Sequence, residues 1–210
     1  MTEPAIVFEN VVKNYGKHNV LSDVSLTINQ GDYVGLVGLN GAGKTTLIKC
    51  LLDFVSLTQG NIQIFGLPHI NTNSRDFLSF LPEKFLPPYY LTGKDFLFYM
   101  AELNQIKIKE SDLEAMCHSL DLDISALSKS VRQYSKGMAQ KLGLIACFIS
   151  QRKLLLFDEP MSGLDPKARA YLKQHLLQLK ESGVTLFFST HLFYVIWRTG
   201  TKPIITPHDG

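Results

Sequence analysis

Residues 33–46 of the chain read Tyr33-Val34-Gly35-Leu36-Val37-Gly38-Leu39-Asn40-Gly41-Ala42-Gly43-Lys44-Thr45-Thr46. From residue 38 to residue 45 this text matches the pattern G-x-x-x-x-G-K-[ST] of a phosphate-binding loop. The apolar run before it is typical of a strand buried on both faces of a parallel sheet, and a helical pattern follows from Thr46 to Leu52. This order of strand, loop and helix predicts a nucleotide site and argues against a glycine-rich turn that matches by chance.

The residue types of the loop suit phosphate binding. Glycines let backbone N–H groups turn inward to phosphate oxygens, and the helix N-terminus adds a partial positive charge. Lys44 is predicted to reach the β- and γ-phosphates and to assist catalysis, and the Thr45 hydroxyl to ligate Mg²⁺. The residues predicted to contact the nucleotide here are Gly38, Asn40, Gly41, Ala42, Gly43, Lys44, Thr45 and Thr46.

Two carboxylates end a second apolar run, residues 154–157, which reads as another buried strand. In an open α/β sheet, ligands bind beyond the carboxyl ends of the strands. We therefore expect Asp158 to hold Mg²⁺, directly or through water, and Glu159 to orient and deprotonate an attacking water. Two acids that only mark a solvated strand end are the alternative, which the phosphate-binding loop makes the weaker one.

The rest of the chain contains both strand-like and helix-like sequence patterns. Short β-rich segments at 6–8, 24–28 and 60–66 precede a helical middle, where Phe96, Tyr99, Met100 and Leu103 are expected to share one helix face. Strand and helix patterns alternate again from residue 154 onward. The middle is therefore expected to be a helical insertion into an α/β core.

Composition limits the classes of function. The net charge of +2 over 210 residues indicates neither nucleic acid nor an anionic membrane as a partner. The three cysteines have no metal-ligand spacing and are expected to be small buried hydrophobes in a reducing compartment. No secretory signal is visible, and no apolar run approaches the roughly 20 residues that span a bilayer. The chain is expected to be soluble, cytoplasmic and held at a membrane, if at all, by a partner.

A third motif narrows the choice among nucleotide-binding proteins. Tyr134-Ser135-Lys136-Gly137-Met138 opens a helix shortly before the carboxylate strand. It resembles the L-S-G-G-Q signature of ATP-binding cassette (ABC) ATPases: Ser135 and Gly137 match, and the other positions depart as in export-type systems. By itself the segment would be an ordinary helix N-cap. Its place between the other motifs favours the ABC resemblance, which covers nearly the whole chain up to His191.

The resemblance implies further site residues. Tyr15 stands where the family stacks an aromatic ring on adenine, although a surface tyrosine remains the alternative. Glu83 stands where the family has a glutamine that senses Mg²⁺ and water, and His191 where a histidine contacts the γ-phosphate. Residues 162–165 resemble the segment called the D-loop. Thus Glu159, His191, Lys44 and Glu83 are predicted to be catalytic, and Thr45, Asp158 and Glu83 to hold the metal.

The resemblance also implies an organisation and partners. It predicts an α/β P-loop core with a mainly parallel sheet flanked by helices, an N-terminal antiparallel β subdomain and an inserted helical subdomain. The parts are residues 1–83, 84–150, 151–191 and an atypical tail at 192–210. ATP and Mg²⁺ would bind between two such domains paired head to tail, as a homodimer or heterodimer, so that Ser135 and Gly137 act on the partner's nucleotide. No nucleic acid is expected.

The implied function is to energise transport through a separate membrane-spanning permease, which would hold this chain on the inner face of the membrane. Phe85, Tyr89 and Tyr90 are expected either to contact that permease or to pack in the core. A non-transport ABC ATPase, or a truncated form that binds ATP with little hydrolysis, are the alternatives. They remain open because the text after His191 lacks the acidic helix and core strand usual in the family.

Two explanations of this tail stay open: a reading frame interrupted near Tyr194, or true divergence. Sequencing the encoding locus separates them, because an intact downstream frame that continues the family pattern would support the interruption. A truncated chain would be expected to lack an edge strand and to expose apolar surface.

Overall fold

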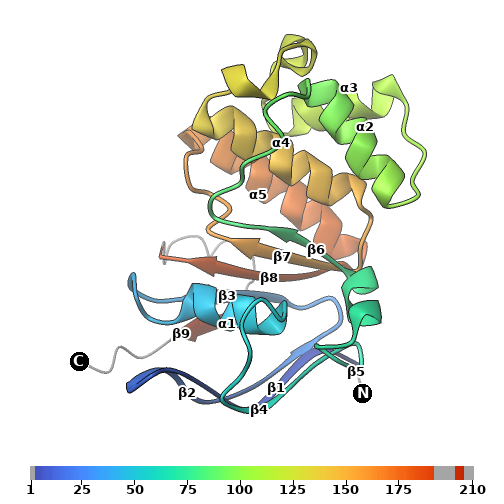
Figure 1. Cartoon of the computed structure of the whole chain (residues 1–210). Helices are drawn as coiled ribbons and strands as arrows, with labels where there is room; N and C mark the ends of the chain where they lie inside the picture. The colour runs from blue at the N-terminus through green and yellow to red at the C-terminus, as the bar shows by residue number, and fades with distance from the viewer. Residues whose placement is uncertain (1–2, 192–201, 206–210) are drawn as a thin grey trace. The chain divides into compact units, whose positions relative to one another are not determined.

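The structure, a computed structural model, describes residues 3–191 and 202–205. In the N-terminal part, four strands form an antiparallel sheet in the order β2-β1-β4-β5 (Figure 1). They are β1 (Pro4–Tyr15), β2 (His18–Asn29), β4 (Gln59–Ile64) and β5 (Leu67–Pro68). Ile6 and Phe8 of β1, with Ile62 and Ile64 of β4, are buried, while the residues between them are less so. This period of two leaves one face of the sheet for the core.

A second sheet has the order β6-β7-β8-β3-β9. Its strands are β3 (Tyr33–Val37), β6 (Leu78–Leu81), β7 (Leu154–Asp158), β8 (Thr185–Thr190) and β9 (Lys202–Ile205). The pairs β7–β8, β8–β3 and β3–β9 are parallel. β3, β7 and β8 are buried along their whole length, as expected for strands covered on both faces. The rings of Phe8 and Phe187, with centroids 6.1 Å apart, join the two sheets in one core.

The helices are α1 (Lys44–Leu51), α2 (Gly93–Leu103), α3 (Glu110–Ser119), α4 (Lys136–Ile149) and α5 (Pro166–Glu181), with short 3₁₀ turns η1 (Thr72–Phe77), η2 (Ile124–Ser128) and η3 (Val131–Gln133). Helix α1 packs against β2 and β7, whereas α2 packs against α4 and η2. The antiparallel sheet, the mainly parallel sheet and the inserted helices confirm the predicted fold class.

The chain divides into two compact units. Unit 1 consists of the described residues of Met1–Ser79, Arg152–Glu159 and Lys180–Gly210, and contains the antiparallel sheet, α1 and all of the second sheet except the last two residues of β6. Unit 2 consists of Phe80–Gln151 and Pro160–Leu179, and contains α2, α3, α4 and all of α5 except its last two residues. Residues 160–179 group with the helices here, whereas the division drawn from the sequence placed them with the core.

Side-chain caps start the helices of unit 2 where the sequence places small polar residues. Thr92 Oγ1 accepts a hydrogen bond from the Asp95 backbone N–H at 3.1 Å at the start of α2. Asp165 Oδ1 accepts one from the Ala168 N–H at 2.8 Å, just before the proline that opens α5. These acceptors satisfy N–H groups that have no partner inside the helix.

The apolar face that the sequence indicates for α2 is only partly the face that is buried. Phe96 is buried, but Tyr99 and Leu103 are exposed, and Leu97 and Ala101 are buried. Contact with α4 decides the rotation of the helix, and the small Ala101 suits a helix that packs closely on its neighbour. An apolar stripe read from sequence does not include that partner.

Part of the tail can be described. Residues 192–201 and 206–210, including Tyr194, lie outside the described residues. Between them, β9 pairs with β3 in parallel, with Val34 opposite Lys202 and Val37 opposite Ile205. An edge strand, β9, therefore lies beside β3, and both explanations of the tail stay open.

Burial explains the chemical state of the three cysteines. Cys50, Cys117 and Cys147 are buried thiols without a disulfide. Burial raises the pKa of Cys50 and raises that of Cys117 to about 11, so both thiols are neutral at physiological pH. Within the described residues, no helix has both the length and the hydropathy to cross a membrane.

His175 predicts a pH dependence of stability. Its ring lies 4.3 Å from that of Phe148, and its buried Nε2 finds no hydrogen-bond partner among the described residues. Burial lowers the pKa of His175 below its ordinary value of 6.5. The unfolded chain then binds this proton more readily, so stability present above pH 6.5 is lost as pH falls toward the folded pKa. We expect the Tm of His175→Phe to fall less steeply than that of wild type as pH decreases below 6.5. The control His118→Phe replaces an exposed histidine and should keep the wild-type dependence of Tm on pH. The same dependence in both variants would contradict this role of His175.

Candidate functional site

The phosphate-binding loop joins β3 to α1 in unit 1. Gly43 has φ 80°, and a Cβ there would lie 2.8 Å from the Val20 carbonyl oxygen. Only glycine therefore fits this position. Lys44 is buried at the first turn of α1, and its Nζ donates to the carbonyl oxygens of Gly38 at 2.7 Å and Leu39 at 2.9 Å. The ammonium group thus lies against the backbone of the loop predicted to wrap the phosphates.

The end of β7 brings a carboxylate to this loop. The Thr45 hydroxyl donates to Asp158 Oδ1 at 3.3 Å. The Ser189 hydroxyl, at the end of β8, donates to the same oxygen. Asp158 is only 3% exposed, so its carboxylate is directed by these two hydroxyls rather than by solvent.

Glu159 follows directly in an unusual backbone conformation. Its φ is 50°, which is uncommon for a residue with a side chain and costs about 1–3 kcal/mol unless its surroundings enforce it. The Glu159 N–H donates to Ser189 Oγ at 3.0 Å, which helps to hold this turn. Its Oε2 lies 3.0 Å from His191 Nδ1, so the structure brings together the predicted base and the histidine predicted to contact the γ-phosphate.

These residues fit a magnesium ion. A hydroxyl and a carboxylate that already meet at 3.3 Å are hard oxygen ligands, which Mg²⁺ prefers. Among the described residues, no cluster of three or more His, Cys, Asp or Glu could hold a metal ion. Thr45 and Asp158 would therefore need the phosphate oxygens of a nucleotide and water as further ligands, which is usual for Mg²⁺.

The signature-like segment begins α4 in unit 2. Ser135 caps the helix, its Oγ accepting from the Met138 N–H at 3.2 Å. Gly137 lies so close to the next loop that a Cβ would approach the Gly163 carbonyl oxygen to 2.8 Å. Lys136, a departure from the family pattern, donates through Nζ to Ser162 Oγ at 3.0 Å. The exposed start of α4 therefore lies beside residues 162–165, the segment that resembles the D-loop.

Two further predicted site residues are Tyr15 and Glu83. Tyr15 ends β1 with its ring half exposed and 4.8 Å from Lys13 Nζ, so both adenine stacking and a surface role remain compatible with its place. Glu83 is exposed in unit 2, just after β6. Its catalytic and metal-binding roles stay predictions.

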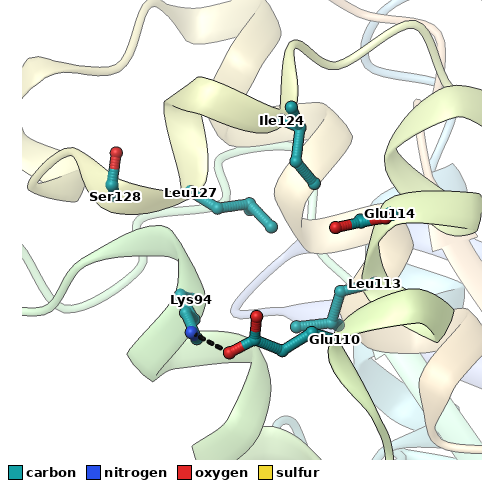
Figure 2. Close-up of a pocket in the computed structure, with 7 residues that line it drawn as sticks. All are labelled: Lys94, Glu110, Leu113, Glu114, Ile124, Leu127 and Ser128. Atoms are coloured by element: carbon teal, nitrogen blue, oxygen red, sulfur yellow. Dashed lines mark hydrogen bonds and ion pairs between the residues drawn. The ribbon is translucent and has the colours of Figure 1, made fainter.

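A cavity in unit 2 is lined by none of the residues predicted to contact the nucleotide. It measures about 170 Å³ between α2, α3 and η2. Figure 2 shows Leu113, Ile124 and Leu127 around this space and the ion pair of Lys94 with Glu110 along one side. Apolar walls and a single paired cation are unsuited to a triphosphate.

Ser189 is a site residue that the sequence reasoning missed. It donates to Asp158 and accepts from the Glu159 N–H, so it links the two carboxylate residues. Its only signal in the sequence was its place at the end of a strand, two residues before His191. The contact depends on the parallel pairing of β7 with β8, which sets Ser189 opposite Asp158.

The fold and this arrangement define a class. A glycine-rich loop between a buried parallel strand and a helix, with a lysine, a threonine and an adjacent strand-end aspartate, is a P-loop nucleotide-binding domain.

Comparison with known proteins shows which family of P-loop proteins the chain resembles. The profile of the ABC transporter family matches residues 21–162. The chain is similar to an uncharacterized ABC transporter ATP-binding protein of Synechocystis sp., with 39% identity over 175 residues, 82% of this chain and 49% of that protein. A lantibiotic transport ATP-binding protein of Streptococcus pyogenes is 32% identical over 184 residues, 88% of this chain and 79% of that protein. The solved structure of an ATP-binding subunit of an ABC transporter matches with TM-score 0.85 and 28% identity, over 96% of this chain and 85% of that one.

The chain belongs to the ABC transporter family, among its ATP-binding proteins. This confirms the resemblance inferred from the signature-like segment. The chain spans about half the length of the first curated relatives that it matches, 49% and 52%.

Proposed function

We propose that this chain binds and hydrolyses ATP and thereby energises transport by a separate membrane-spanning partner. The observation that carries the proposal is the meeting of Thr45 with Asp158, and of Glu159 with His191, beside the phosphate-binding loop of unit 1. The similar lantibiotic transport protein of S. pyogenes supports a role in transport.

The residues of unit 1 have different roles in the proposed hydrolysis. Loop N–H groups and Lys44 bind the β- and γ-phosphates and offset their charge. Glu159 accepts a proton from the attacking water, and His191, 3.0 Å from its carboxylate, orients that carboxylate and contacts the γ-phosphate. Mg²⁺ held by Thr45 and Asp158 would neutralise charge on the phosphate oxygens.

The signature segment supplies the second half of each site. In a head-to-tail pair, the N-terminus of α4 would present the N–H groups of its first turn to the γ-phosphate bound by the partner chain. Ser135 caps that turn and is exposed, and so is available to a partner. ATP would then join the two chains, and hydrolysis would release them.

The loop before α2 is the proposed contact with a permease. Tyr89 and Tyr90 are 68% and 73% exposed, and their rings pack edge to face 5.6 Å apart. Leu86, in the same loop, is 89% exposed. Exposed aromatic and aliphatic side chains gathered in one loop are typical of a protein interface. Phe85 differs, because its ring packs 5.8 Å from the buried Phe96.

Phosphate release from ATP by the purified chain tests the proposal. We expect steady release with Mg²⁺ present and its loss when EDTA removes the metal, because Thr45 and Asp158 then lack the ion that joins them to the phosphates. Binding of a fluorescent ATP analogue is measured in parallel. A folded chain that binds this analogue but releases no phosphate with Mg²⁺ would contradict the proposed hydrolysis.

A further inference from the structure

Lys141, in the second turn of α4, makes a buried polar contact that the functions above do not use. Lys141 is 8% exposed, and its Nζ donates to the backbone carbonyl oxygen of Asp121 at 2.6 Å. The same nitrogen lies 3.7 Å from Asp121 Oδ2 and 3.8 Å from Asp165 Oδ2. One ammonium group therefore joins α4 to the turn after α3 and to the residue that caps α5.

Two further side chains of α4 contact residues 160–165, the segment that ends with Asp165. The buried Gln140 donates through Nε2 to the Pro160 carbonyl oxygen at 3.2 Å. Lys136 reaches Ser162 as described. Together, Lys136, Gln140 and Lys141 hold residues 160–165 along the first two turns of α4, all within unit 2.

The two lysines that contact Asp121 are expected to differ in how much they stabilise this part of unit 2. Lys167 pairs with Asp121 at 2.6 Å, but its side chain is 66% exposed, and exposed ion pairs contribute little because solvent screens them. The Lys141 side chain is 10% exposed. Removing it would leave the Asp121 carbonyl group and two carboxylates without their shared donor.

We propose that Lys141 is a positioning residue, which fixes the start of α4 so that Ser135 and Gly137 can act on the ATP bound by a partner chain. The inference rests on the proposed head-to-tail pairing. Lys141 lies on the same helix as Ser135, and a helix transmits orientation over two turns as a rigid element. Its anchors, Asp121 and Asp165, lie on two other segments of unit 2 and so define that orientation.

Lys141→Met tests the proposal, because it keeps the long apolar stem and removes the charge. We expect a turnover number about tenfold lower, with the KM for ATP changed less than about twofold, since the variant's own phosphate-binding loop is intact. Lys141→Arg should restore most of the activity. Lys167→Met is the matched control and should stay near wild type. Similar losses in Lys141→Met and Lys167→Met would overturn the specific role.

Mixing two variants shows whether Lys141 acts across the dimer. Lys44→Ala damages the loop, and Lys141→Met would damage the signature side, so a mixed head-to-tail dimer keeps one intact site. Random mixing of equal amounts leaves about a quarter of all sites intact. We expect phosphate release to rise well above that of either variant alone. If no gain appears, Lys141 acts within its own chain or only on stability, and the proposal fails.

A second mixture separates this inference from the proposed function. Ser135→Arg with Lys44→Ala must also regain activity if the chains pair head to tail. Recovery in that mixture but not with Lys141→Met would overturn the Lys141 role alone, and recovery in neither would overturn the pairing itself. If Lys141→Met does not fold, Asp165→Asn takes its place, because asparagine still caps α5 but lacks the charge that faces Lys141.

Discussion

Glu159→Gln is expected to lower the turnover number for phosphate release by about a hundredfold or more, the usual contribution of a general base. Glutamine keeps the size of the side chain, and its amide can still lie near His191, but it cannot accept the proton of the attacking water. The backbone turn at φ 50° should persist, because the Ser189 hydroxyl bonds the N–H and not the side chain. ATP affinity should therefore stay within a few-fold of wild type.

Two measurements on this variant check the expectation. Phosphate release and ATP binding are compared with those of Glu102→Gln, an exposed glutamate of α2. Light scattering with MgATP should show a dimer that persists longer than the wild-type one, since hydrolysis no longer separates the chains. Turnover of Glu159→Gln near the wild-type value would exclude Glu159 as the base and redirect attention to other groups near the γ-phosphate.

Lys44→Ala is expected to have the second large effect, a loss of ATP affinity of about a hundredfold. One or two hydrogen bonds from a charged donor, worth roughly 1.5–3 kcal/mol each, account for this size at 1.4 kcal/mol per tenfold. The change also removes the donor to the Gly38 and Leu39 carbonyl oxygens, so the loop loses an internal support.

Titration with a fluorescent ATP analogue measures this loss. Lys49→Ala is the control, because Lys49 lies on the same helix, in its last turn, and is exposed. Its affinity should match that of wild type, and a circular dichroism melt should show that both variants are folded. Wild-type affinity in Lys44→Ala would mean that the loop backbone alone binds the phosphates and that the lysine is not required.

Much of the site was predictable because its parts are local in sequence. The strand, loop and helix at residues 33–52 form one continuous segment whose geometry follows from glycine conformations and hydrophobic period. Asp158 and Glu159 could be placed at a sheet edge for the same reason. Their partner Ser189 could not, because its contact requires β7 and β8 to be neighbours in a particular register. Side-chain spacing along a chain carries no such information.

The sequence thus determined the class of the protein: a phosphate-binding loop, a strand-end carboxylate pair and a signature-like helix start, in the order of the ABC family. Tertiary structure alone decided which face of α2 is buried, how Ser189 orients both carboxylate residues, and that Lys141 joins three segments of unit 2. The physical reason is common to all three. Local geometry depends on residues next to each other in the chain, whereas burial and polar pairing depend on which distant segments pack together.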